Sequence, residues 1–548
     1  MSSAAELPQA VEPKKKKTSS FKYTFTCAIS ATMIDIILGY DMGVMSGASL
    51  YIKEDLKLTD VQLEILMGIM SLYSLVGSFA AGRTSDWIGR RYTIVLTAAI
   101  FFIAAILLGL AINYAMLMAG QFVAGVGLGY GLTIVPVYIA EISPASLRGS
   151  LTSIPELSLS LGILLAYVSN YVFARLPLHL GWRVMLGISA APSVVLALMV
   201  FRMPESPRWL VMKGRVAEAR AMLEKTSDTP EEAAERLADI KAAAGIREGD
   251  NDVAVPVRKG GEENRVWREL ILSPTPAMRR ILLSAIGIQF LLQASGIGSV
   301  VQYSPRIFQR AGVVDKERLL GTTCAVGAAK LLFTLVATFL LDRVGRRPLL
   351  LCSIGGVIVS LVGLGVGLTV ADRHPGSKIT WALALCIASN LTLISSFAAG
   401  LGPIAHVYAT EIFPLRVRAL GSALGVASNR VTSGVVLMSF LSLSKAITIG
   451  GVFFLFAGIT ALGWVLVFIY LPETRGLTLE EMGKLFGMTD AGMNENQATK
   501  EKTCGNVHKL DRNDANRVRC LVWKTLFPAL FVVYHSKTEQ IQGTDTVT

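Results

Sequence analysis

Twelve long apolar segments constrain the fold of this 548-residue chain more than any other feature. A helix needs about 20 mostly apolar residues to cross the hydrocarbon core of a bilayer. Six such segments lie at 22–46, 62–82, 92–112, 115–140, 151–173 and 183–203, and six more at 281–303, 319–341, 348–370, 381–408, 417–442 and 449–471. The sequence therefore predicts an all-α membrane protein with twelve transmembrane helices.

Composition supports a place in the lipid bilayer and argues against a nucleic-acid partner. Only 17% of the residues are charged, whereas a soluble protein carries about 25%, and the mean hydropathy is +0.53. The net charge of +12 comes mostly from the tails and from short segments between apolar runs, as in cytoplasmic loops. The run Lys14 to Lys17 predicts either contact with anionic lipid headgroups or an orientation signal.

No spacing of cysteine or histidine residues indicates a disulfide framework, a metal site or a bound cofactor. The six cysteines and five histidines are scattered along the chain. The first twenty residues are polar and contain lysines, so we expect no cleavable signal peptide.

The apolar segments divide the chain into five parts. We expect a cytoplasmic tail at 1–21, a six-helix bundle at 22–203, a cytoplasmic linker with short amphipathic helices at 204–280, a second six-helix bundle at 281–471 and a cytoplasmic tail at 472–548. An even number of spans puts both ends on one side, and the arginine-bearing short loops make that side cytoplasmic. The plasma membrane is the expected location. The apolar stretch Cys520 to Tyr534 is too short to count as a span.

Three loop motifs recur in the same order in both halves, roughly 260 to 270 residues apart. Asp86-Trp-Ile-Gly-Arg90-Arg91 returns as Asp342-Arg-Val-Gly-Arg346-Arg347, Glu141-Ile-Ser-Pro-Ala-Ser-Leu-Arg148 as Glu411-Ile-Phe-Pro-Leu-Arg-Val-Arg418, and Pro204-Glu-Ser-Pro-Arg208 as Pro472-Glu-Thr-Arg475. This repeat predicts two pseudo-symmetric six-helix bundles with a central site between them.

These motifs, with Gly39-Tyr-Asp41, resemble the sugar-porter family of the major facilitator superfamily over residues 22–485. Ile154-Pro-Glu156, Tyr303-Ser-Pro-Arg-Ile-Phe308 and Asn429-Arg-Val-Thr-Ser-Gly434 are most similar to plant polyol and monosaccharide transporters. The resemblance implies the major facilitator fold and proton symport of polyols or monosaccharides by alternating access. We find no nucleophile–base arrangement with supporting context, so we expect a carrier and not an enzyme.

Ionisable residues inside membrane spans are costly and therefore candidates for function. The resemblance gives Asp41 the proton-coupling role, with a structural hydrogen-bonding Asp as the alternative. Gln121 stands where the family usually has the Arg that pairs with this acid, which predicts weakened coupling or an uncoupled facilitator. Asp35 lies about 240° around the helix from Asp41, and a structural or interfacial role is favoured for it.

A hydroxyl-rich substrate needs hydrogen-bonding side chains beside an apolar wall. The resemblance assigns substrate contact to Glu156, Gln293 and Asn429, and Gln289 shares a helix face with Gln293. His406 replaces a family Trp, and Gly298 replaces a polar residue. For Glu156 the alternative is a counter-charge to Lys330 or Arg430. Gly400-Leu-Gly-Pro403 predicts a break in the tenth span.

The repeated loop motifs predict a cytoplasmic gate of ion pairs, made in one state and broken in another, or else fixed structural bracing. Single exposed ion pairs contribute only about 0–1 kcal/mol, so several would act together. The candidates are Asp86, Arg90, Arg91, Glu141, Arg148, Asp342, Arg346, Arg347, Glu411 and Arg418. A sensor that binds sugar without transporting it is the remaining alternative.

Overall fold

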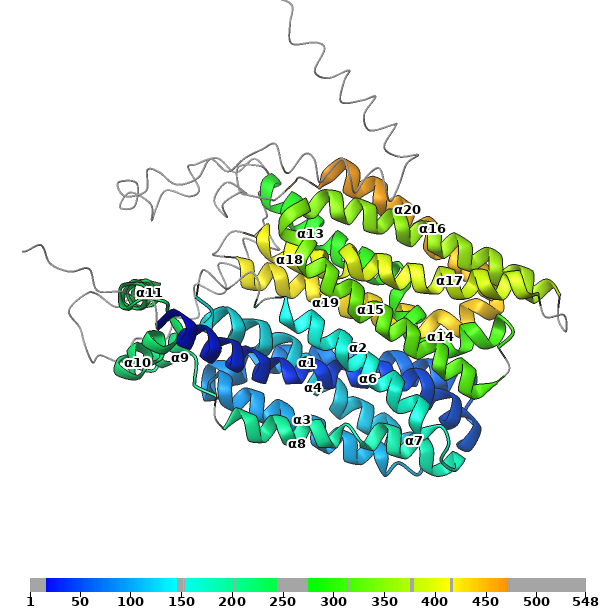
Figure 1. Cartoon of the computed structure of the whole chain (residues 1–548), viewed down its shortest axis with the longest axis horizontal. Helices are drawn as coiled ribbons and strands as arrows, with labels where there is room; N and C mark the ends of the chain where they lie inside the picture. Colours follow the sequence, from blue (N-terminus) through cyan, green and yellow to red (C-terminus); the bar gives the residue numbers. More distant parts are fainter. Residues whose placement is uncertain are drawn as a thin grey trace, which may run out of the picture.

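The computed structural model describes residues 16–144, 151, 153–201, 203–243, 275–313, 315–374, 379–413, 417–471 and 473. These residues form helices, and twelve spans among them are long and apolar enough to cross a membrane. The predicted fold class is thereby confirmed. Figure 1 shows the spans as two bundles side by side, with the linker helices at one end.

The first bundle contains the spans that precede the linker. Its helices are α1 (Lys16–Asp55), α2 (Asp60–Ile88), α3 (Arg90–Gly109), α4 (Tyr114–Ile142), α6 (Ile154–Phe173), α7 (Leu178–Gly187) and α8 (Ala190–Val200). The last two form one span that is interrupted near Ser189.

Short helices follow the first bundle, within the predicted linker. They are α9 (Pro207–Met212), α10 (Val216–Thr226) and α11 (Pro230–Ala243). Leu210, Leu223 and Leu237 pack into a small apolar core of their own, so the linker helices are amphipathic and support one another.

The second bundle is built from α13 (Pro276–Ala294), α14 (Ile297–Arg310), α15 (Lys316–Val344), α16 (Arg346–Arg373), α17 (Thr380–Ser396), α18 (Gly402–Glu411), α19 (Arg418–Ile447) and α20 (Ile449–Tyr470). Two of its spans are broken. A π-helical turn at Phe397–Leu401 separates α17 from α18 just before Pro403, which confirms the predicted break. The break between α13 and α14 was not predicted; it occurs at Gly296, whose φ is +78°.

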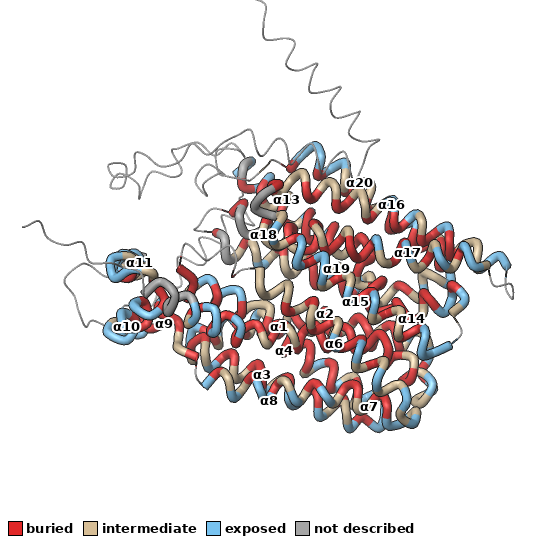
Figure 2. The backbone as a smooth tube through the Cα atoms, in the orientation of Figure 1, coloured by how far each residue is buried: buried red, intermediate tan, exposed pale blue. Residues whose placement is uncertain are grey.

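Large apolar side chains cover the outside of the bundles. Trp87 is 77% exposed and Phe79 75% exposed, and Figure 2 shows exposed positions along the outer helices with buried positions facing inward. A water-soluble protein rarely leaves so much apolar surface uncovered. The twelve spans therefore face lipid.

Glycines bring α1 and α6 into direct backbone contact. A Cβ at Gly39 would lie 2.0 Å from the Leu159 carbonyl oxygen, and one at Gly162 would lie 2.1 Å from the Ile36 carbonyl oxygen. Small residues permit such close approach of membrane helices. Residues at matching heights on α1 and α6, such as Asp35 and Glu156, are consequently neighbours.

Candidate substrate and coupling site

Four polar side chains of the second bundle form a hydrogen-bonded network. Asn429 of α19 donates to Gln289 Oε1 at 3.0 Å and accepts from Gln293 Nε2 at 3.2 Å. Gln289 Nε2 also lies 3.2 Å from His406 Nδ1. The structure thus brings together the amide and imidazole groups that the sequence proposed for substrate contact.

Gly298 leaves room beside this network. A Cβ at this position would lie 3.5 Å from Gln293 Oε1, so the glycine exposes the amide oxygen where a larger side chain would cover it. Gln289 and Asn429 are almost fully buried, whereas Gln293 and His406 are partly exposed. The partly exposed pair forms the accessible edge of the network.

Glu156 joins the two bundles. Its Oε1 lies 3.6 Å from Lys330 Nζ of α15, with the Glu156 side chain 26% exposed. Lys330 also donates to Ser160 at 3.1 Å, and Ser160 lies 3.1 Å from Thr334. The sequence left open whether Glu156 contacts substrate or acts as a counter-charge to Lys330. In this structure it is the counter-charge to Lys330. Its partly exposed carboxylate can still accept further hydrogen bonds.

Three other ionisable groups surround this ion pair. Asp35, His406 and Arg430 each interact electrostatically with Glu156. Asp35 Oδ2 and the Nε and Nη1 atoms of Arg430 are buried and have no hydrogen-bond partner among the described residues. The centre of the molecule therefore contains hydrogen-bonding atoms on Asp35 and Arg430 that no described side chain satisfies.

Asp41 and Gln121 lie apart from this centre. Asp41 is buried, and its carboxyl group hydrogen-bonds Ser189 between α7 and α8. Gln121 Nε2 approaches Met45 Sδ at 3.5 Å, one turn further along α1. Within the described ranges Asp41 makes no ion pair, in keeping with the neutral residue at position 121.

The candidate gate of the first bundle is an ion-pair network centred on Arg90. Its guanidinium contacts Glu141 at 3.0 and 3.2 Å and Asp86 at 3.1 Å. Glu141 also accepts from Ser206 at 2.5 Å. Arg91 instead donates from its guanidinium to the Phe201 carbonyl oxygen. All these groups belong to the first bundle and the start of the linker.

Two glutamates that the sequence analysis did not single out, Glu205 and Glu473, cap the start of a helix in corresponding places of the two halves. Glu205 accepts from the backbone N–H groups of Arg90 and Arg91, at 2.8 and 3.2 Å. Glu473 accepts from those of Arg346 and Arg347, at 3.0 and 3.2 Å. Each carboxylate satisfies free N–H groups at a helix start. Their place in the repeated Pro-Glu motifs was the available signal.

The glycines that precede these two helices, Gly89 and Gly345, also correspond to each other in the two halves. Gly89 and Gly345 have φ values of +96° and +99°, a region that favours glycine. Burial raises the pKa of Glu205, while its backbone hydrogen bonds act in the opposite direction.

The other gate candidates are only partly described. Asp342, Glu411 and Arg418 lie in α15, α18 and α19, with their side chains outside the described part, and Arg148 lies outside the described residues altogether.

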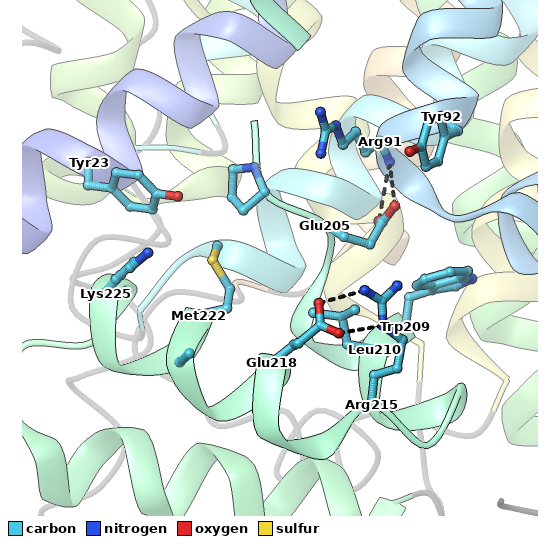
Figure 3. Close-up of a pocket in the computed structure, with 12 residues that line it drawn as sticks. Tyr23, Arg91, Tyr92, Glu205, Trp209, Leu210, Arg215, Glu218, Met222 and Lys225 are labelled. Atoms are coloured by element: carbon cyan, nitrogen blue, oxygen red, sulfur yellow. Dashed lines mark hydrogen bonds and ion pairs between the residues drawn. The ribbon is translucent and has the colours of Figure 1, made fainter. Parts of the chain in front are cut away.

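A peripheral cavity of about 380 Å³ lies beside the Glu205 cap. Figure 3 shows Tyr23, Glu205, Trp209 and Arg215 around it, with Arg215 paired to Glu218. It lies between α1, α3 and the linker helices, away from the Gln289–Asn429 network, so it is not the candidate substrate site.

Further interactions join the two bundles at the end opposite the linker. Glu64 of α2 accepts from the Ser442 N–H and hydroxyl groups of α19, both at 2.5 Å. Asp60 pairs with Lys445 at 2.5 Å. Sequence reasoning missed this set, although an acid inside an apolar segment, such as Glu64, is itself a signal.

Twelve membrane spans in two related bundles, with hydrogen-bonding groups where the bundles meet, define a membrane transporter. The chain belongs to the sugar (and other) transporter family, whose model matches residues 27–486. This confirms the resemblance drawn from the motifs and the expectation of a carrier.

Named relatives match most of the chain. It is 56% identical over 492 residues to putative polyol transporter 1 of Arabidopsis thaliana, covering 89% of this chain and 96% of the relative. It is also 56% identical over 481 residues to polyol transporter 5 of the same plant, covering 88% and 89%. The glucose transporter GlcP of Staphylococcus epidermidis is 33% identical over 449 residues, covering 82% and 94%.

A solved structure of the proton:xylose symporter XylE, bound to 6-bromo-6-deoxy-D-glucose, has the same fold. Its TM-score is 0.70 at 24% identity, and the match covers 85% of this chain and 100% of the symporter. A partially occluded inward open structure of XylE from E. coli gives a TM-score of 0.66 at 22% identity, covering 82% and 100%. These matches establish the major facilitator fold.

Proposed function

We propose that this protein carries polyols or monosaccharides across the plasma membrane by alternating access, with a proton as the coupling ion. The observation that carries the proposal is the Gln289–Gln293–Asn429–His406 network, which stands near Glu156 of the other bundle. Amides and carboxylates can both form hydrogen bonds with the hydroxyl groups of a sugar or polyol, because a hydroxyl group both donates and accepts. The names of the Arabidopsis relatives favour a polyol.

Alternating access requires that contacts between the bundles differ between two states. The Glu64–Ser442 and Asp60–Lys445 contacts bridge the bundles at the end opposite the linker. The described contacts of the Arg90 network, by contrast, lie within the first bundle and linker. With the termini and linker in the cytoplasm, this arrangement corresponds to a state closed to the outside. The two repeated helix caps are then fixed bracing around a mobile gate.

Asp41 is the proton site that the family pattern suggests, and Gln121 is the observation that argues against coupling at Asp41 and favours the alternative, an uncoupled facilitator. Gln121 is uncharged and its side chain contacts Met45. It therefore forms no ion pair with Asp41 that the opening of the transporter could break. The two functions differ in one property: a symporter concentrates its substrate against a gradient, whereas a facilitator only equilibrates it.

Purified protein in liposomes tests the proposal with a panel of linear polyols, cyclitols and monosaccharides. We expect saturable uptake of at least one panel member, with accumulation above equilibrium when the vesicle interior is more alkaline. Uptake that only equilibrates identifies the facilitator. Binding without flux for every panel member would establish a sensor and contradict the proposed transport.

A further inference from the structure

The ionisable groups at the centre are sorted by bundle. Both acids, Asp35 and Glu156, belong to the first bundle, on α1 and α6. The basic and titratable groups that interact with Glu156 belong to the second bundle: Lys330 on α15, His406 on α18 and Arg430 on α19. A motion that separates the bundles at this level therefore separates opposite charges.

The two acids are held close together. Asp35 lies one turn before Gly39, and Glu156 lies about one turn before Leu159, the two positions where the α1 and α6 backbones touch. Asp35 is 5% exposed, interacts electrostatically with Glu156, and has a carboxylate oxygen without a partner in the described part of the chain. Two neighbouring carboxylates repel each other when both are ionised, most strongly where one of them is buried, as Asp35 is, and one shared proton removes that repulsion.

We infer that Asp35 and Glu156 form a proton-binding pair, and that the proton on this pair, distinct from any on Asp41, is the one that couples to substrate movement. The inference rests on the proposed polyol transport. The proton arrives from water on one side, binds a carboxylate oxygen of the pair, and leaves to water on the other side, with no other bond made or broken.

Coupling follows from the ion pair that bridges the bundles. Lys330 Nζ and Glu156 Oε1 are 3.6 Å apart across the boundary, and pulling them apart would leave uncompensated charges in a poorly solvated place. A proton on the acidic pair cancels one negative charge and lowers the cost of separation. By linkage, a state with separated bundles then binds the proton more tightly.

Asp41 lacks this connection. Its described hydrogen-bond partner, Ser189, lies in the same bundle, so a proton there changes no charge pair across the boundary. Arg430 offers a link to the substrate instead. It interacts electrostatically with Glu156, and its Nε and Nη1 atoms, which have no partner among the described residues, can donate to a hydroxyl oxygen.

The test is Asp35→Asn in the full chain, reconstituted in liposomes and assayed with sorbitol and glucose. Two rates are measured: exchange across the membrane at equal pH, and accumulation with an alkaline interior. We expect wild-type protein to accumulate at least one probe severalfold, and Asp35→Asn to bring the accumulation ratio to about 1 while exchange remains measurable. Asp35→Glu, which restores an ionisable group, should recover accumulation.

Thr32→Val is the matched control, because Thr32 is a buried α1 residue whose hydroxyl donates only within its own helix, to the Ile29 carbonyl oxygen. It should accumulate like wild type. Asp35→Asn protein with wild-type accumulation would overturn the inference. Wild-type protein that exchanges without accumulating would also overturn it and leave transport standing, whereas wild-type protein without exchange would refute the proposed function itself.

A second measurement covers the case in which Asp35→Asn does not fold. Probe binding to purified wild-type protein in weakly buffered detergent should change the number of bound protons, as read with a pH-indicator dye. An unchanged proton count across pH 5 to 8, with binding confirmed by calorimetry, would overturn the inference.

Discussion

The contact between Glu64 and Ser442 gives a sharp prediction about the equilibrium between the two gate states. Glu64 is 1% exposed, and both oxygens of its carboxylate accept from Ser442 at 2.5 Å. A hydrogen bond to a charged group contributes about 1.5–3 kcal/mol. Glu64→Gln keeps the shape but removes the charge and one acceptor, so we expect the closed outer gate to lose about 2 kcal/mol, or about 30-fold in the equilibrium.

Labelling of a cysteine from outside measures this shift. Ser71 is buried between the bundles, 3.3 Å from Ser433, so a membrane-impermeant maleimide should reach Ser71→Cys only when the outer gate opens. In vesicles with the outer face exposed, Glu64→Gln should raise the labelling rate of Ser71→Cys by about 10- to 30-fold over the same cysteine with Glu64 intact.

Asp55→Asn is the matched control for this experiment. Asp55 accepts from Arg183 at 3.2 Å and from Trp182 at 2.9 Å, all inside the first bundle. Its loss should leave the labelling rate unchanged. An unchanged rate in Glu64→Gln as well would refute the assignment of this contact to the outer gate.

Three further predictions concern the centre and its helices. Asn429→Leu removes both network hydrogen bonds and a hydroxyl partner, so polyol affinity measured by calorimetry should fall about 5- to 100-fold; unaltered affinity would exclude the network as the substrate site. Lys330→Met should lower the unfolding temperature because it leaves the Glu156 charge unpaired, and adding Glu156→Gln should recover part of the loss; simple additivity would show that the pair does not interact. Gly296→Ala should destabilise the protein by about 1–3 kcal/mol, since its φ is +78°, whereas Gly287→Ala in the same span, with open space at its Cβ, should be neutral or stabilising; equal effects would contradict the strained break.

The sequence predicted what depends on local patterns. Apolar length alone located the twelve spans, and the Gly400–Pro403 segment located the π-helical break because proline cannot donate a helical hydrogen bond. The break at Gly296 escaped prediction because a single glycine within an apolar run is compatible with a continuous helix. Its effect depends on Phe456, 160 residues away, which would collide with a Cβ there.

The side-chain partners could not be predicted for a related reason. The angle of about 240° between Asp35 and Asp41 around α1 predicted that the two acids lie in different places. In the structure they have different neighbours, Glu156 and Ser189. It could not show that glycine-mediated packing would set Asp35 beside Glu156 on α6. Likewise, the choice between substrate contact and a counter-charge for Glu156 depended on how α6 packs against α15.

Counterflow tests the central claim, a hydroxyl-binding site that opens to one side at a time, most directly. Liposomes with purified protein are loaded with an unlabelled polyol that the uptake panel identifies, then diluted into a trace of the same polyol in labelled form. The account predicts a transient accumulation of label inside, above its outside concentration, because a reorienting carrier exchanges one molecule for another. Label that enters only to equilibrium and independently of the internal polyol would contradict it.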